Sequence, residues 1–168
     1  MTRWRPPREK SSRYITAAGV RALNVELREL WQLRRRDVLP ALSAAAAEGD
    51  RSENAEYIYR KKQLGEIDRR IHYLSKRLDE VEVVRLAPAR RDRIHFGAWV
   101  TLEDENGVEH RYRIVGADEI DPARSCISVD SPLARALLGR GTGDSIGVEL
   151  PERRAEFLVI EIDYPAEK

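Results

Sequence analysis

Apolar residues recur twice in the first half of the chain at alternating intervals of three and four residues. The first series comprises Val20, Leu23, Leu27 and Leu30, and the second comprises Leu64, Ile67, Ile71, Leu74, Leu78 and Val81. This spacing is typical of a coiled-coil seam, in which each helix carries one apolar stripe. Because such a stripe must be buried, the two series predict a pair of helices that pack against each other.

The residue numbers of the two series also predict how the helices are paired. In an antiparallel hairpin, facing positions have a constant sum of residue numbers. The sum is 101 for Val20 with Val81, Leu23 with Leu78, Leu27 with Leu74 and Leu30 with Ile71. Arms of roughly thirty residues extend about 45–50 Å at about 1.5 Å per residue. We therefore expect residues 16–84 to form an antiparallel coiled-coil finger with its tip near 49–56.

The first arm of this finger carries signals for its start, an interruption and its end. Thr16 is the predicted N-cap. Pro40 lacks the backbone donor that a position inside a helix needs, so we expect a kink or short break near Leu39. Four alanines at 44–47 then favour helix again, before Gly49 ends it.

The second half of the chain has a different period. Residues 85–93 are too polar to continue the seam and are predicted to be a linker. Asn106-Gly107 is a hairpin signal. The predicted elements beyond the linker are strands at 98–102, 108–114, 127–130, 146–150 and 156–162, and a helix from Pro132 to Leu138 with Ser131 as its N-cap. The fold class is α+β: an N-terminal antiparallel α-helical coiled-coil hairpin followed by a small domain, 94–168, with a mostly antiparallel sheet.

Composition narrows the class of protein. Charged residues make up 35% of the 168 residues and aromatic residues 7%, which is typical of long exposed helices. Thirty Lys and Arg nearly balance 29 Asp and Glu, although residues 1–15 form a basic arm. No apolar run approaches the roughly 20 residues of a membrane span, and the start lacks the apolar core of a signal peptide. A single cysteine excludes an intramolecular disulfide, so we expect a cytoplasmic protein without membrane contact.

The predicted tip carries two carboxylates. Asp50 and Glu53 are three residues apart, which places both on one side of a helix start. They match a capping box, in which the two side chains bond backbone amides. They also match a partial Mg²⁺ site, because this ion accepts one or two carboxylates together with water and phosphate oxygens. Two carboxylates are too few to hold the ion well, so a second macromolecule would have to complete such a site.

A group of basic residues falls partway along the finger. By the constant sum, residues 34–36 lie at the height of 65–67. The group consists of Arg34, Arg35, Arg36, Lys61, Lys62, Arg69 and Arg70. It is either a phosphate-binding patch or an ordinary charged surface. Tyr57 and Tyr59 either stack on bases near the tip or pack it.

The remaining candidate groups are interpreted as structural. His72, His95 and His110 have no ligand spacing and no paired nucleophile. Cys126 beside a strand is interpreted as a small core residue. The stretch Gly139-Arg140-Gly141-Thr142-Gly143 lacks the lysine and the setting of a phosphate loop and is interpreted as a turn.

Four stretches of the chain, in this order, resemble the Gre family of bacterial transcript cleavage factors, and its GreB type in particular. They are Gly49-Asp50-Arg51-Ser52-Glu53-Asn54-Ala55-Glu56-Tyr57 with Tyr59, Lys61 and Lys62; Phe96-Gly97-Ala98-Trp99-Val100; Arg113-Ile114-Val115-Gly116; and the segment from Ile127 to Leu138. The similarity extends over about residues 13–164. Arg51 and Ser52 favour the GreB type over the GreA type, whereas the basic arm is not a family motif.

The resemblance implies a role and a set of site residues. The finger enters the secondary channel of RNA polymerase, where Asp50 and Glu53 help to hold a shared Mg²⁺ for hydrolysis of backtracked RNA. Arg51, Ser52, Asn54 and Tyr57 are implied to support the tip, and the basic patch to contact the nascent RNA near its 3′ end. The C-terminal domain is implied to be FKBP-like and to dock on the polymerase with Asp130, Ser131 and Pro132. The protein would be a monomer and would not be an enzyme alone.

Two alternatives stay open at this point. One is a regulator that uses the same channel without cleavage, as DksA-like proteins do; the retained carboxylates argue against it. The other is a prolyl isomerase, which the FKBP-like fold suggests, although fold alone does not carry function.

Overall fold

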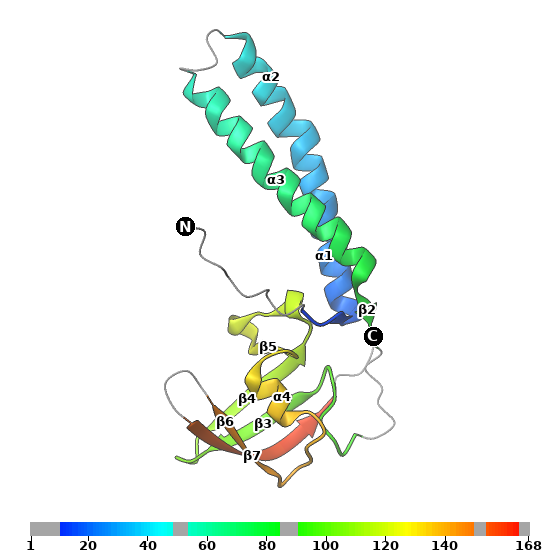
Figure 1. Cartoon of the computed structure of the whole chain (residues 1–168), viewed down its shortest axis with the longest axis vertical. Helices are drawn as coiled ribbons and strands as arrows, with labels where there is room; N and C mark the ends of the chain where they lie inside the picture. Colours follow the sequence, from blue (N-terminus) through cyan, green and yellow to red (C-terminus); the bar gives the residue numbers. More distant parts are fainter. Residues whose placement is uncertain (1–10, 49–53, 85–90, 150–153, 165–168) are drawn as a thin grey trace, which may run out of the picture. The chain divides into compact units, whose positions relative to one another are not determined.

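The computed structural model describes residues 11–48, 54–84, 91–149 and 154–164 (Figure 1). The chain divides into two compact units. The helical unit comprises residues 20–81, and the sheet unit comprises residues 1–19 together with 82–168. The first ten residues of the predicted basic arm, residues 49–53 of the predicted tip and most of the predicted linker lie outside the described residues.

The helical unit is a pair of antiparallel arms, which confirms the predicted hairpin (Figure 1). The first arm consists of α1 (Ala17–Leu33), a π-helical segment η1 (Arg34–Val38) and α2 (Leu39–Ala47), and the second arm is α3 (Ala55–Glu80). Thr16 caps α1 as expected, since its hydroxyl oxygen accepts the Gly19 N–H at 3.0 Å. Among the described helices, none is long and apolar enough to cross a membrane.

The interruption expected near Leu39 is a change of helical winding rather than a break. The Leu39 N–H donates to the Arg34 carbonyl, five residues back, and Pro40 follows within the first turn of α2. A proline in a helix clashes with the carbonyl four residues before it and leaves that carbonyl without a donor. The wider π turn accommodates the ring and lets the arm continue.

The π segment also shifts the seam by one residue. A seam that continued from Leu30 by threes and fours would reach Arg34 and then Asp37. In the structure Val38 is fully buried whereas Asp37 is exposed, because the π turn inserts one residue. Val38 packs with Ile67 and Ile71 in a cluster that Leu27, Leu30 and Leu64 complete. The loss of periodicity beyond Trp31 in the sequence is therefore a phase shift and not the end of the seam.

The sheet unit contains, among its described residues, a five-strand sheet in the order β5-β4-β3-β7-β6. The strands are β3 (Trp99–Asp104), β4 (Glu109–Val115), β5 (Cys126–Ser128), β6 (Ser145–Glu149) and β7 (Arg154–Asp163). All neighbouring pairs are antiparallel except β4 with β5. The tight turn between β3 and β4 has Gly107 at a φ of 75°, which glycine adopts without strain. The mostly antiparallel α+β fold is confirmed.

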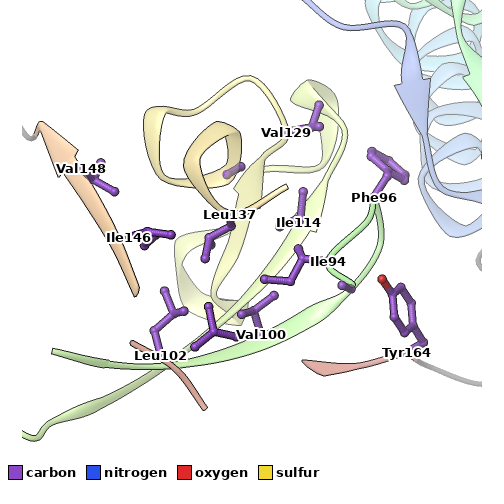
Figure 2. Packing of buried hydrophobic residues seen from close by; sticks show 13 residues of the cluster. Ile94, Phe96, Val100, Leu102, Ile114, Val129, Leu137, Ile146, Val148 and Tyr164 are labelled. Atoms are coloured by element: carbon purple, nitrogen blue, oxygen red, sulfur yellow. The ribbon is translucent and has the colours of Figure 1, made fainter. Parts of the chain in front are cut away.

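Short elements complete the sheet unit. The strands β1 (Tyr14–Ile15) and β2 (Glu82–Val83) pair in parallel, and α4 (Pro132–Leu137) follows β5. The 3₁₀ turns η2 (Ala117–Glu119) and η3 (Pro122–Arg124) lie between β4 and β5. Figure 2 shows apolar side chains from β3, β4, β6 and α4 meeting in one core. Leu137 of α4 is fully buried there, as are Val100, Leu102 and Ile114 of the sheet.

The phase shift predicts unequal effects of two neighbouring substitutions. Val38→Ala removes buried methyl groups from the seam and should lower the free energy of unfolding by roughly 1–3 kcal/mol. Asp37→Ala changes an exposed side chain and should stay within about 0.5 kcal/mol. Urea unfolding followed by circular dichroism measures both. A larger loss for Asp37→Ala than for Val38→Ala would contradict the shifted seam.

Candidate functional site

The predicted tip lies only partly within the described residues. Asp50, Arg51, Ser52 and Glu53 fall outside them, whereas Asn54 and Tyr57 are described. Asn54 is the N-cap of α3, and its Oδ1 accepts the Tyr57 N–H at 3.0 Å. The N-cap of α3 is thus Asn54, whereas the predicted capping box of Asp50 and Glu53 lies outside the described residues. A short side-chain acceptor directly before Ala55 already satisfies the helix start, four residues beyond Asp50.

Asn54 also joins the two arms of the hairpin. Its Nδ2 donates to the Ala45 carbonyl in the last turn of α2, at 2.7 Å. Ala45 is buried, with 3% of its surface exposed. The amide thus bonds α2 through its donor and α3 through its acceptor. This bond joins the two ends of the eight-residue connection between Ala45 and Asn54. Both predicted tip carboxylates belong to this connection.

The aromatic residues near the tip have different environments. Tyr57 is partly buried, whereas Ile58 and Tyr59 are exposed at 53% and 57%. Arg60 lies 5.5 Å from the Tyr59 ring centre and bonds the Glu56 carboxylate at 2.7 Å. Of the two alternatives for the tyrosines, Tyr57 fits packing and Tyr59 has a face open to solvent.

Two residues of the predicted basic patch tie the arms together. Arg34 Nε donates to Asp68 Oδ1 at 2.7 Å. Arg70 binds the Glu26 carboxylate through two nitrogens, at 2.6 and 2.9 Å. By helical geometry, Asp68 and Arg70 lie on opposite flanks of the buried stripe that contains Ile71. The two ion pairs therefore join the arms on both flanks of the seam.

The other basic residues are distributed around the finger. Arg34 and Arg35 each lie 5.5 Å from the Trp31 ring centre, in a cation–π arrangement. Lys62 and Arg69 are seven residues apart and share the face of α3 away from the seam, whereas Lys61 shares the flank of Asp68. Arg35, Arg36, Lys61, Lys62 and Arg69 are exposed. The structure thus leaves exposed cations along the finger without gathering all seven on one face.

The predicted docking segment connects β5 to α4. Asp130 Oδ2 accepts the Ser12 N–H at 2.8 Å, and the Asp130 N–H donates to Ser128 Oγ at 3.0 Å. Ser131 caps α4 as predicted, since its hydroxyl oxygen accepts the Ala134 N–H at 3.2 Å. Pro132 is exposed at the first turn of α4. The segment is therefore held rigidly while its proline faces solvent.

A polar contact without a local sequence signal holds the start of α1. Glu119 Oε2 accepts the backbone N–H groups of Thr16 and Gly116, each at 3.0 Å, and Oε1 accepts the Thr16 hydroxyl. Any side chain at Gly19 would collide with the Glu119 carboxyl group. The two partners are 103 residues apart, so no local pattern could have predicted the contact.

The histidines fit their structural interpretation, whereas Cys126 is only partly buried and is not a core residue as expected. His110 Nε2 lies 3.1 Å from Asp104 Oδ2, and this hydrogen bond is the main reason that the pKa of Asp104 is lowered. The His95 N–H donates to the Tyr164 hydroxyl at 2.8 Å, while His72 is exposed. Burial raises the pKa of the Cys126 thiol, which is the opposite of what an activated nucleophile needs.

In the described part of the chain, no group of three or more His, Cys, Asp or Glu side chains could hold a metal ion. A hollow of about 600 Å³ opens beside His110 and Arg111, and Thr101, Glu109, Ile160 and Glu161 complete its lining. This lining includes no nucleophile paired with a base. The hairpin end remains the candidate site.

Comparisons with known proteins cover almost the whole chain. The family described as "Transcription elongation factor, N-terminal" matches residues 13–83. The family described as "Transcription elongation factor, GreA/GreB, C-term" matches residues 88–164. The chain is 57% identical to transcription elongation factor GreB of Xanthomonas axonopodis pv. citri, over 98% of each chain. It is 53% identical to transcription elongation factor GreB of Pseudomonas aeruginosa, again over 98% of each chain.

The contact between Glu119 and the start of α1 predicts a stability change. Glu119→Ala leaves the N–H groups of Thr16 and Gly116 without their acceptor and should lower the free energy of unfolding by about 1–3 kcal/mol. Glu109→Ala, which removes an exposed carboxylate of β4, is the matched control and should have little effect. Chemical unfolding of the full chain provides the comparison. Equal stabilities for the two variants would show that the contact contributes nothing.

Proposed function

Because the chain belongs to the GreA/GreB family of transcription elongation factors, we propose that it is a transcript cleavage factor for bacterial RNA polymerase. Its hairpin enters the secondary channel of the polymerase and brings the tip to a backtracked RNA. The polymerase then hydrolyses its own nascent RNA and releases a 3′ fragment. The new RNA 3′ end lies at the active site, so elongation resumes. The chain is a factor for the polymerase active site and not an enzyme in itself.

The observation that carries this proposal is the closed end of the hairpin. The bond between Asn54 and Ala45 brings the two arms together at the base of a short connection, and that connection contains Asp50 and Glu53. By sequence, the two carboxylates thus belong to the segment that connects the arms of a narrow helical pair. A narrow pair reaches a site that is buried within a larger partner, where a globular domain would not fit.

The chemistry of these two side chains fits a shared Mg²⁺ site. Carboxylate oxygens are preferred Mg²⁺ ligands, and the ion keeps waters and substrate phosphate oxygens as its other ligands. When bound, the ion would activate the attacking water and offset charge on the phosphate. Asp50 and Glu53 would hold and orient it together with polymerase residues, and Arg51, Ser52, Asn54 and Tyr57 would support them.

The rest of the chain positions the tip. The ion pairs of Arg34 and Arg70 join the two arms that carry the tip segment and so help to fix the register of the arms. The exposed cations Arg36, Lys62 and Arg69 would attract the phosphates of the RNA that leaves the active site. Pro132, with Asp130 and Ser131 behind it, would dock the sheet unit on the polymerase. The protein acts as a monomer in the cytoplasm.

A non-cleaving regulator of the same channel is the alternative. The relatives at 57% and 53% identity described above are each named transcription elongation factor GreB, which does not favour it. Cleavage of stalled complexes separates the two functions directly.

A cleavage assay on backtracked polymerase complexes tests the proposal. Wild-type protein with Mg²⁺ should release short 3′ RNA fragments. Asp50→Asn and Glu53→Gln should each slow release by about 10²–10³-fold, the loss typical for removal of one electrostatic contact to a transition state. Binding to the polymerase should stay near the wild-type value.

The matched control for these substitutions is Glu48→Gln, which removes an exposed carboxylate two residues before Asp50. It should cleave at the wild-type rate. Wild-type protein that binds the polymerase and releases no fragments would overturn the proposal in favour of the non-cleaving regulator.

A further inference from the structure

Asn54 makes two hydrogen bonds that act on different parts of the hairpin. The bond from the Tyr57 N–H to Oδ1 is local and caps α3. The bond from Nδ2 to the Ala45 carbonyl spans the two arms. We propose that Asn54 is a positioning residue for the tip carboxylates, and that its cross-arm bond holds the base of the tip segment. This inference rests on the proposed cleavage function.

The chemistry of the side chain explains why an asparagine is needed. An amide has an acceptor oxygen and a donor nitrogen, so it can cap a helix and donate to a second segment at once. Aspartate and serine are equally good caps. An ionised aspartate cannot donate, and the shorter serine hydroxyl does not reach the second arm while it caps the first. The cross-arm bond is thus separable from the cap by substitution.

The acceptor of the cross-arm bond is the carbonyl of a buried residue at the end of a helix. Ala45 is in the last turn of α2, where carbonyl groups lack their usual helical partners. The Glu48 N–H also donates to this carbonyl, at a longer 3.3 Å. Because Ala45 is buried, water competes poorly for its carbonyl, and the short bond to Asn54 is strong there.

Loss of this bond should affect cleavage more than binding. The arms remain joined by the buried seam and by the ion pairs of Arg34 and Arg70. Docking residues of the sheet unit are untouched. A displacement of about 1 Å at a reacting centre can cost 10²-fold in rate, so a looser base would lower the cleavage rate at saturating protein.

The test compares Asn54→Asp and Asn54→Ser with the wild type in the full chain. Both variants keep a cap acceptor, both lose the cross-arm donor, and only the first adds a charge. Each should reduce the maximal cleavage rate about tenfold or more, while the half-saturating protein concentration stays near the wild-type value and the thermal midpoint stays well above the assay temperature. Asn24→Ala is the control, since Asn24 donates to the Val20 carbonyl within its own helix. It should cleave at the wild-type rate.

The possible outcomes are distinct. Equal losses in maximal rate for the two variants, without a change in half-saturation, support the positioning role. A wild-type rate for either variant overturns it, as does a loss that appears only as weaker binding or as unfolding. Failure of the wild-type protein itself to stimulate cleavage would instead refute the proposed function on which the inference rests.

Discussion

Burial of one apolar stripe between two otherwise charged arms is the constraint on which the helical unit depends. Full burial of a leucine or isoleucine side chain stabilises a fold by about 1.5–3 kcal/mol, and Ile67, Ile71 and Leu74 are all at most 6% exposed. An exposed ion pair contributes only about 0–1 kcal/mol. The seam therefore provides the stability, and the ion pairs of Arg34 and Arg70 select its register. A helical pair held in this way needs no thick core, which keeps it narrow.

Much of this architecture could be predicted from the spacing of residues. Two stripes with the same period and a constant sum define a hairpin, and an Asn-Gly turn between alternating segments defines a strand pair. The π segment could not be predicted, since Pro40 indicates that the arm is disturbed but not how the helix adapts. Val38 was missed for the same reason: one inserted residue changes which side chain faces the partner.

The residue types of the candidate site could be predicted from the sequence, whereas the contacts that support the site could be predicted less well. Asp50 and Glu53 stand out as a carboxylate pair, but their spacing also matched a cap that Asn54 provides instead. Several neighbouring polar residues could cap the helix, and tertiary contacts decide which of them does. Here the hydrogen bond to the Ala45 carbonyl favours Asn54. The contact of Glu119 with Thr16 depends on folding of distant segments and leaves no local signal.

The proposed function assigns the tip and the docking segment to different units of the chain. The length of the hairpin is then as important as the identity of the tip residues. Removal of residues 20–26 together with 75–81 deletes one heptad from each arm and preserves the facing sum of 101. The ion pair of Arg34 with Asp68 remains, whereas Arg70 loses its partner Glu26. The arm becomes about 10 Å shorter, while Asp50 and Glu53 remain. The account predicts that this shortened protein binds RNA polymerase but releases no RNA fragments from backtracked complexes. Cleavage at the wild-type rate would contradict it.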